Sequence, residues 1–344
     1  MPGPVAGMWD VDDLLREPES VGVLAGRPLV TVAVDGGGGL DGLADRLGAL
    51  PAVTVGVATP GAVPTAGGTV GVDIVLTGTP DPPAPWVWCA DVAATVEHLR
   101  ARAAANPTAA VALVQLLRLS ARLDVAGGLV AESFVYGLLQ AGEEHRRWLA
   151  GRPPRRPRPA GRAVVVERDG AVLEVELHRP EVRNAFSAQM RDELVAAFEL
   201  VAADPTIEQV RVRGAGPSFC SGGDLDEFGT AEDPSQAHLV RTTRSAARTL
   251  LGCAGKTVFA VHGACVGAGL ELAALAGRVE ADPGTTFLLP EVAMGLVPGA
   301  GGTATLPKRI GRHRTAYLAL SGLPVDAGTA RRWGLVDEVV PARG

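Results

Sequence analysis

The sequence predicts an α/β protein with a large aliphatic core. Apolar runs typical of strands are followed by segments with helical spacing, both before and after a proline- and arginine-rich stretch near the middle of the chain. The 344 residues suffice for two domains, and 47% of them are hydrophobic. Because aromatic residues make up only 4% of the chain, small aliphatic side chains must fill the interior.

Charge and hydropathy argue against several classes of protein. The 32 Lys and Arg residues against 38 Asp and Glu residues give a net charge of −6, which disfavours a general nucleic-acid or membrane-surface binder. The N-terminus has neither the basic start nor the apolar core of a secretory signal. No stretch reaches the roughly 18 apolar residues of a membrane span. We therefore expect a cytoplasmic protein with no nucleic-acid partner and no membrane partner.

The cysteines favour the same compartment. Cys89, Cys220, Cys253 and Cys265 are scattered along the chain and form no CxxC pair. Free thiols in a reducing environment are therefore expected rather than disulfides or a zinc site. With six histidines in the chain and no motif that groups them, we predict no metal site.

The stretch "GRPPRRPRPAG", residues 151–161, is the clearest boundary in the sequence. Its prolines stiffen the chain and its arginines keep it solvated, which is typical of a linker. The alternative is a strip that contacts phosphate groups, if the segment folds beside a ligand. We predict an N-terminal α/β and helical domain over 1–150 and a second domain over 162–344.

Strand and helix signals follow the linker in order. Residues 163–180 alternate apolar and charged side chains around Asp169-Gly170, a turn signal that predicts a hairpin. Ser187 is a suitable N-cap for a helix to about residue 204, and residues 209–216 read as a short strand. The apolar positions of the helix recur at helical spacing at Met190, Leu194, Ala197, Phe198 and Val201.

The half before the linker shows the same alternation without a candidate site. The runs "PLVTVAVDG", "VTVGVATP" and "VGVDIVLTG" look like strands, "LDGLADRLGAL" looks like a helix, and residues 92–149 are helical in pattern. We find no cluster of titratable residues beside a glycine loop in this half. We therefore expect it to be structural and non-catalytic.

Three stretches after the linker, residues 219–225, 262–272 and 287–311, each combine glycines with an acid. Glycine lets backbone N–H groups approach a ligand closely, and two N–H groups that converge on one oxygen form an oxyanion hole. Two glutamates beside such a hole, Glu271 and Glu291, can transfer protons at adjacent carbons.

From the residues alone, simpler interpretations stay open. A glutamate in an apolar helix, such as Glu271, is often partly exposed or hydrogen-bonded. Glu291 follows a proline and suits a capping or turn position. Asp224 follows two glycines, where aspartate commonly hydrogen-bonds to nearby backbone.

Five stretches of the C-terminal half form a recognisable series: "HRPEVRNAFS", "GPSFCSGGDLDEF", "HGACVGAGLELAALAGRVEA", "FLLPEVAMGLVPGAGGT" and "RRWGLVDEVVP". In order and spacing they closely resemble the crotonase (enoyl-CoA hydratase/isomerase) superfamily, from about Ala163 to Pro341. This resemblance implies a crotonase-like core, a ββα superhelix, and chemistry on acyl-CoA thioesters.

The resemblance also assigns roles to single residues. The backbone N–H groups of Gly223 and Ala268 align with the oxyanion hole that holds the thioester oxygen as it becomes an enolate. Glu271 and Glu291 align with the two catalytic glutamates of true hydratases. We assign water activation to Glu271 and protonation of the α-carbon to Glu291.

Further residues align with the CoA-binding parts of the family. The backbone around Val182, Arg183 and Ala185 is expected to cradle the adenine of CoA, and Ser221, Asp224 and Leu225 are expected to contribute to the same binding region. No cofactor is expected beyond the CoA moiety of the substrate. Five further side chains are candidates either for the acyl pocket or for the core: Phe219, Phe228, Phe287, Leu288 and Leu296.

The chain departs from the family pattern at three positions and at its ends. Ala268 stands where hydratases usually have glycine, and Thr257 and His262 replace a common proline and asparagine; we interpret the last two as structural. The helical tail that usually follows "GLVDEVVP" is resembled instead by residues 105–154, before the linker. Residues 1–150 are thus expected to be either a degenerate crotonase-like half whose last helices supply that tail, or an unrelated α/β appendage.

The leading functional hypothesis is a hydratase that adds water to a 2-enoyl-CoA. The alternatives are an isomerase or another enolate-forming enzyme of the same fold, and a non-catalytic acyl-CoA-binding or assembly subunit. The acyl-CoA substrate is the expected small-molecule partner. Family behaviour also implies a homo-oligomer, a trimer or a dimer of trimers.

Overall fold

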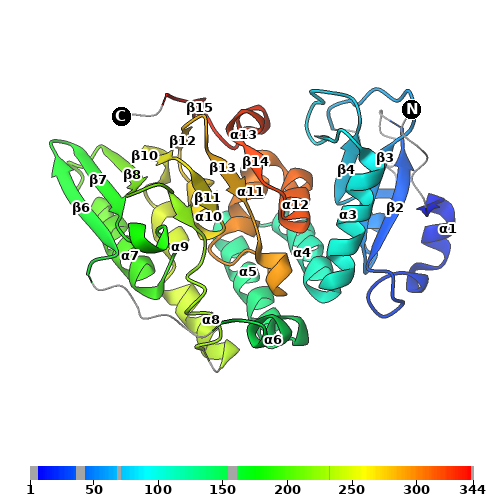
Figure 1. Cartoon of the computed structure of the whole chain (residues 1–344), viewed down its shortest axis with the longest axis horizontal. Helices are drawn as coiled ribbons and strands as arrows, with labels where there is room; N and C mark the ends of the chain where they lie inside the picture. Colours follow the sequence, from blue (N-terminus) through cyan, green and yellow to red (C-terminus); the bar gives the residue numbers. More distant parts are fainter. Residues whose placement is uncertain (1–6, 36–42, 68–70, 154–160, 232, 342–344) are drawn as a thin grey trace.

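A computed structural model describes residues 7–35, 43–67, 71–153, 161–231 and 233–341 of the chain. It confirms the α/β class, because parallel strands and helices alternate along both halves. In Figure 1 the N-terminal sheet lies at one end of the molecule and the C-terminal sheets at the other, with helices between them. Most of the expected linker lies outside the described residues, so the domain boundaries stay a prediction.

The N-terminal sheet is five-stranded and wholly parallel, in the order β1-β2-β3-β4-β5. Two of its strands, β2 and β3, are almost entirely buried, which explains their continuous runs of valine. The strands are β1 (Met8–Trp9), β2 (Leu29–Val34), β3 (Val53–Ala58), β4 (Ile74–Thr77) and β5 (Val87–Trp88).

Helices follow this sheet in the order that the sequence predicts. Short helices α1 (Val11–Arg16) and α2 (Ala44–Gly48) belong to the N-terminal end of the molecule. The longer ones form the layer between the sheets, where α5 packs against its neighbour α4 and against two helices of the C-terminal half, α8 and α11. These longer helices are α3 (Val92–Ala105), α4 (Pro107–Ser120), α5 (Val125–Gln140) and α6 (Glu143–Ala150).

Two sheets build the C-terminal half. The larger has the order β15-β12-β10-β8-β7-β6 and is parallel except for the β6–β7 hairpin, and the smaller has the order β14-β13-β11-β9. Their strands are β6 (Val164–Asp169), β7 (Val172–Leu177), β8 (Gln209–Gly214), β9 (Cys220–Ser221), β10 (Thr257–Val261), β11 (Ala264–Val266), β12 (Arg278–Ala281), β13 (Thr286–Leu288), β14 (Val325–Asp326) and β15 (Glu338–Val339).

Helices connect these strands and cover them. Short 3-10 turns at 180–182, 254–256 and 291–294 are labelled η3, η4 and η5. The α-helices are α7 (Ala188–Ala203), α8 (Pro234–Thr243), α9 (Ala246–Leu251), α10 (Ala268–Ala273), α11 (Gly302–Ile310), α12 (Arg312–Ser321) and α13 (Ala327–Trp333).

The local predictions after the linker are confirmed. The hairpin turns at Gly170, which has a positive φ of 58°. In β7 the apolar side chains are buried and the glutamates between them are only half-buried. The side chain of Ser187 accepts a hydrogen bond from the backbone N–H of Met190, and all five predicted apolar positions of α7 are buried.

A buried ion network joins the N-terminal sheet to the helical layer. Asp73 is 1% exposed and forms an ion pair with Arg118 of α4 at 2.6 Å. The same guanidinium donates hydrogen bonds to three backbone carbonyls of the residues 48–52. Arg312 of α12 approaches Asp73 to 3.6 Å. The two halves therefore share a satisfied polar contact.

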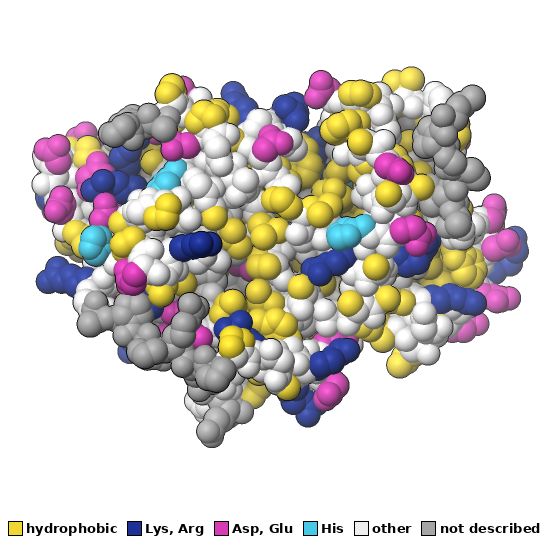
Figure 2. Space-filling view, viewed as in Figure 1, with side chains coloured by type: hydrophobic (Ala, Val, Ile, Leu, Met, Phe, Trp, Pro, Cys, Tyr) yellow, Lys and Arg dark blue, Asp and Glu magenta, His cyan; other side chains and the backbone are white. Residues whose placement is uncertain are grey.

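The thiols are buried, and the surface carries charges of both signs. All four cysteines are free and buried. Basic and acidic side chains are interspersed over the face seen in Figure 2. Among the helices of the described segments, none has the length and apolarity needed to cross a membrane.

Candidate active site

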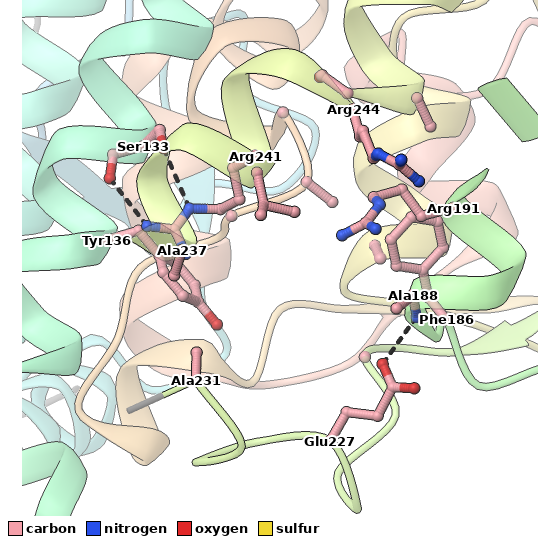
Figure 3. A pocket seen from close by; sticks show the side chains of 18 of the residues that line it. Ser133, Tyr136, Phe186, Ala188, Arg191, Glu227, Ala231, Ala237, Arg241 and Arg244 are labelled. Atoms are coloured by element: carbon pink, nitrogen blue, oxygen red, sulfur yellow. Dashed lines mark hydrogen bonds between the residues drawn. The ribbon is translucent and has the colours of Figure 1, made fainter. Parts of the chain in front are cut away.

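A cavity of about 600 Å³ lies between the helical layer and the C-terminal sheets. Its wall comes from both sides of the linker: α5 contributes one side, and the starts of α7 and α9, the helices α8 and α10, Glu291 and the loops 223–231 and 299–301 also contribute. Figure 3 shows the side chains that surround it. Helix α5 belongs to residues 1–150, which are expected to be structural and non-catalytic, and the structure places it in the pocket wall; that these residues take no part in catalysis stays a prediction.

Glu271 lies in α10 and faces this cavity with its side chain 1% exposed. Its Oε2 accepts hydrogen bonds from the backbone N–H groups of Ala300 at 2.7 Å and Gly302 at 2.8 Å. A Cβ on Gly302 would lie 2.6 Å from Cγ of Glu271. The glycine therefore allows the loop to approach the carboxylate closely.

Glu291 begins η5 and also lines the cavity, but its contacts differ. Its Oε2 is buried and has no hydrogen-bond partner among the described residues. Its Oε1 lies against Gly267, where an added Cβ would come within 2.6 Å of that oxygen. An unpaired buried carboxylate oxygen is costly, so Oε2 can accept a hydrogen bond from a ligand or carry a proton.

A third buried glutamate, Glu132 of α5, completes the group. Its Oε1 accepts from the N–H of Gly301 at 2.7 Å, and its Oε2 accepts from the N–H and the hydroxyl of Thr303 at 2.8 and 2.7 Å. Both oxygens are thus occupied by the loop that also holds Glu271. Through Glu132, the N-terminal half of the chain therefore holds residues 301–303 in place.

Burial raises the pKa of all three glutamates. It raises the pKa of Glu271 to about 7, against the opposing effect of the two backbone N–H donors. It raises the pKa of Glu132 to about 8, with the negative charge of Glu271 adding to the shift. The pKa of Glu291 is raised well above its usual value by burial and, in second place, by the charge of Glu271. Glu271 is therefore the readiest of the three to ionise near neutral pH.

The two expected oxyanion donors line the same cavity. Gly223 forms a parallel bridge with Phe186 in which the hydrogen bonds use Gly222 and Asp224, and the N–H of Gly223 makes no backbone hydrogen bond to the residues that the structure describes. Ala268 is the first residue of α10 and follows Gly267, whose φ is 49°. Its N–H makes no backbone hydrogen bond within the described part of the chain. Both N–H groups are available to a ligand.

The expected CoA-binding residues lie beside Gly223, and most do not reach the cavity wall. Of the six, Asp224 lines the cavity, but its carboxylate pairs with buried Arg179 at 2.9 Å. Val182, Arg183, Ala185, Ser221 and Leu225 lie outside the lining. The N–H of Ser221 donates to the carbonyl of Arg183 at 3.0 Å, so the two segments are held together. Their role toward CoA stays a prediction.

The five candidate acyl-pocket side chains divide between the two interpretations. Phe228 lines the cavity. Phe219, Phe287 and Leu296 are fully buried in the core, and Leu288 lies outside the lining. The substituted positions Thr257 and His262 each hydrogen-bond to a backbone carbonyl away from the cavity, which agrees with structural roles.

Among the wall residues that sequence reasoning missed are Glu132, Tyr136 and Arg241. Glu132 carries the same signal that singled out Glu271, a lone acid in the apolar helical stretch "LVAESFVYGLL". It was missed because the search for acids required a neighbouring glycine loop. In the fold, that loop comes from a segment about 170 residues later.

This combination of fold and paired buried glutamates defines a protein of the crotonase class. The family model of enoyl-CoA hydratase/isomerase matches residues 167–344, slightly more than half of the chain. The chain therefore belongs to this family, as its C-terminal motifs predict.

Curated relatives carry corresponding names. YhaR of Bacillus subtilis, named as an enoyl-CoA hydratase/isomerase, is 36% identical over 170 residues, which cover 49% of this chain and 66% of that protein. EchA8 of Mycobacterium bovis, named as an enoyl-CoA hydratase, is 34% identical over 183 residues, 52% of this chain and 69% of that protein. This chain spans about two thirds of the length of the curated relatives it matches.

Solved structures of the same class are similar over the same part. The crystal structure of enoyl-CoA hydratase from Thermoplasma volcanium GSS1 is 33% identical, with a TM-score of 0.49, over 53% of this chain and 73% of that one.

Proposed function

We propose that this protein is a hydratase that adds water across the double bond of a 2-enoyl-CoA. One observation carries the proposal: two buried glutamates and two backbone N–H groups line the same cavity. Glu271 accepts two backbone hydrogen bonds, whereas Oε2 of Glu291 accepts none, and neither N–H group makes a backbone hydrogen bond to the described residues. The N–H groups of Gly223 and Ala268 supply the electrostatic stabilisation that an enolate oxygen needs. The glutamates supply a base and an acid.

Glu271 acts as the base in this mechanism. Its pKa of about 7 leaves it substantially ionised at neutral pH, and the N–H groups of Ala300 and Gly302 hold one carboxylate oxygen in place. The other oxygen takes a proton from water as the water oxygen bonds to the β-carbon. The electron pair of the double bond moves toward the thioester carbonyl, whose oxygen becomes the enolate.

Glu291 acts as the acid. Burial raises its pKa well above the usual range, so the carboxyl keeps its proton at neutral pH. It gives that proton to the α-carbon as the enolate collapses back to the thioester. The product is a 3-hydroxyacyl-CoA, and proton exchange with solvent returns both glutamates to their starting states.

Mass spectrometry of CoA esters tests the activity. A panel of short, branched and aromatic 2-enoyl-CoAs would be incubated with the wild-type enzyme and with Glu271→Gln and Glu291→Gln. The account predicts a gain of one water with the wild type and its loss in both variants. An isomerised product would shift the assignment to a double-bond isomerase. Binding without conversion would indicate an acyl-CoA-binding subunit.

We further propose that helices α4–α6 replace the helical tail of the family. The packing of α5 on α8 and α11 and the hydrogen bonds of Glu132 to residues 301–303 support this. Residues 161–344 expressed alone are then expected to be unstable or inactive. A stable and active fragment would contradict the idea. The origin of residues 1–150 as a degenerate crotonase-like half belongs to the same proposal.

The assembly also remains a proposal. The family resemblance implies a homo-oligomer, a trimer or a dimer of trimers, and the mass of the protein in solution, measured by light scattering, decides between these and a monomer.

A further inference from the structure

Three arginines line the cavity, and one of them differs from the other two. Arg191 and Arg244 both form ion pairs with Asp192, at 2.8 and 2.9 Å. Arg241, on α8, forms no ion pair with any acid in the described part of the chain. Among the described residues, Arg241 is thus the one cavity arginine without an ion pair, although the charge of Glu132 acts on it from a longer distance.

The partners of Arg241 are all neutral. Its Nε donates to the hydroxyl of Ser133 at 3.1 Å, Nη1 donates to Oε1 of Gln140 at 2.9 Å, and Nη2 donates to the carbonyl of Ser133 at 3.3 Å. The guanidinium lies 4.7 Å from the centre of the Tyr136 ring. Since a guanidinium has five N–H donors, these three bonds leave two donors for a ligand.

Tyr136 provides a second polar group on the same side of the cavity. Its hydroxyl makes no hydrogen bond to the residues that the structure describes, and burial raises its pKa, so the group stays a proton donor. In Figure 3, Arg241 points toward α5 and Tyr136, whereas Arg191 and Arg244 lie across the cavity near Phe186 and Ala188. The phenol and the guanidinium of Arg241 are thus separated from the paired arginines.

Arg241 is half-buried, and this burial lowers its pKa, since a cation that lies partly out of water without an ion pair is costly. A carboxylate would relieve this cost, because its two oxygens match the planar fork of a guanidinium. Tyr136 is within electrostatic range of all three buried glutamates and of Arg241. Arg241, Tyr136, Glu271 and Glu291 line the same cavity of about 600 Å³.

On the basis of the proposed function, we propose that the acyl group of the substrate ends in a carboxylate, which Arg241 and Tyr136 bind. The substrate class is a monothioester of CoA with an unsaturated dicarboxylic acid. The competing role for Arg241 is purely structural: its hydrogen bonds to Ser133 and Gln140 would hold α8 against α5. Loss of a structural role would lower activity on all acyl groups alike, whereas loss of a carboxylate subsite would lower activity only on acyl groups that carry the charge.

Turnover of two matched substrates separates these roles. The probes are 2-hexenedioyl-CoA, which has a terminal carboxylate, and 2-hexenoyl-CoA, which has a methyl group there. Wild-type kcat/KM is expected to favour the first. Arg241→Met is expected to lower kcat/KM for the first by about tenfold to a hundredfold and to change it less than about threefold for the second. Tyr136→Phe, which keeps the ring, is expected to lose activity on the first probe alone.

Binding separates this inference from the proposed function. Calorimetry with the saturated esters adipyl-CoA and hexanoyl-CoA needs no turnover, so a wild-type preference for adipyl-CoA that Arg241→Met abolishes would support the subsite even if neither enoyl probe is hydrated. Arg248→Met, on the exposed side of α9, is the matched control and should leave both affinities unchanged. Equal affinity of the wild type for the two esters, or equal losses on both in Arg241→Met and Tyr136→Phe, would overturn the proposal.

Discussion

Glu132 and Glu271 accept hydrogen bonds from interleaved backbone N–H groups of residues 300–303, a loop that runs into the first turn of α11. Glu271 takes the first and third of these N–H groups, and Glu132 takes the second and fourth. One glutamate comes from the helical layer before the linker and the other from α10 after it. The loop is therefore clamped between two acids, and a change in one is transmitted to the position of the other.

Glu132→Gln tests this clamp. Both oxygens of Glu132 accept from N–H groups, so an amide nitrogen must face a donor, which costs about 1–3 kcal/mol of stability. We expect a lower melting temperature and a lower kcat. We also expect the alkaline limb of the pH–rate profile to move to lower pH, because the charge of Glu132 helps to raise the pKa of Glu291.

Glu144→Gln is the matched control for that variant. Glu144 of α6 is buried and accepts from the N–H groups of Thr108 and Ala109 at 2.7 and 3.0 Å, outside the cavity. It should lower stability without moving the pH–rate profile. If Glu132→Gln had the same pH–rate profile as the wild type, Glu132 would have a structural role only.

Gly302→Ala should disable the site through Glu271. The new Cβ would lie 2.6 Å from Cγ of Glu271, so the loop or the carboxylate must shift. A displacement of about 1 Å at a reacting group costs about a hundredfold in rate, and we expect a loss of that order in kcat/KM. Gly284→Ala, where nothing lies within 4 Å of the new Cβ, is the control. Wild-type kcat/KM in Gly302→Ala would show that the close approach is unimportant.

The pH dependence of kcat/KM follows from the two glutamates. Activity is expected to fall as pH drops through about 7, because Glu271 must be ionised to take a proton. It is also expected to fall at higher pH, where Glu291 loses the proton that it must donate. A stopped assay from pH 5 to 10 measures both limbs. Activity that stays level as the pH falls from 8 to 5 would contradict the role of Glu271, because its pKa would then lie nearer the usual value of 4.5.

The free energy of unfolding should decrease as pH rises through the pKa of Glu271, whereas salt-bridged acids make it increase with pH. The pKa of Glu271 is higher in the folded chain than its usual value of 4.5. The resulting stabilisation is fully present below pH 4.5 and is lost as pH rises through about 7. The free energy of unfolding should fall by up to about 1.4 kcal/mol per pH unit from this group.

Urea denaturation of the wild type and Glu271→Gln at pH 5, 6, 7 and 8 isolates this contribution. One oxygen of Glu271 accepts both backbone hydrogen bonds, so the amide oxygen of a glutamine can keep them. The variant should lose less stability than the wild type between pH 5 and 8. Parallel curves for the two proteins would contradict the raised pKa of Glu271.

Local patterns in the sequence predict much of this fold. The hairpin around Gly170 and the capped helix after Ser187 follow from turn chemistry and apolar spacing, and both form as expected. The motifs of the C-terminal half also predict that Glu271, Glu291, Gly223 and Ala268 lie around one cavity, as they do. These features depend on residues that are near in sequence or that belong to a recognisable motif.

Contacts across the linker could not be predicted in the same way. The Glu132 side chain meets residues 301–303 only because α5 packs against α11. Helical spacing shows that α5 is apolar on more than one face, but it does not show which element covers each face. The hydrogen bond from Arg241 to Ser133 could not be predicted for the same reason, because it forms only when α8 packs against α5.

The division of labour between Glu271 and Glu291 is tested most directly by hydrogen exchange at the α-carbon. A saturated acyl-CoA would be incubated in D₂O with the wild type, Glu271→Gln and Glu291→Gln at an alkaline pH above the raised pKa of Glu291, where its carboxylate can take the α-proton, and deuterium at the α-carbon would be measured by mass spectrometry. The account predicts exchange with the wild type and with Glu271→Gln, because no water needs to be activated, and no exchange with Glu291→Gln. Exchange that survives in Glu291→Gln and disappears in Glu271→Gln would contradict it.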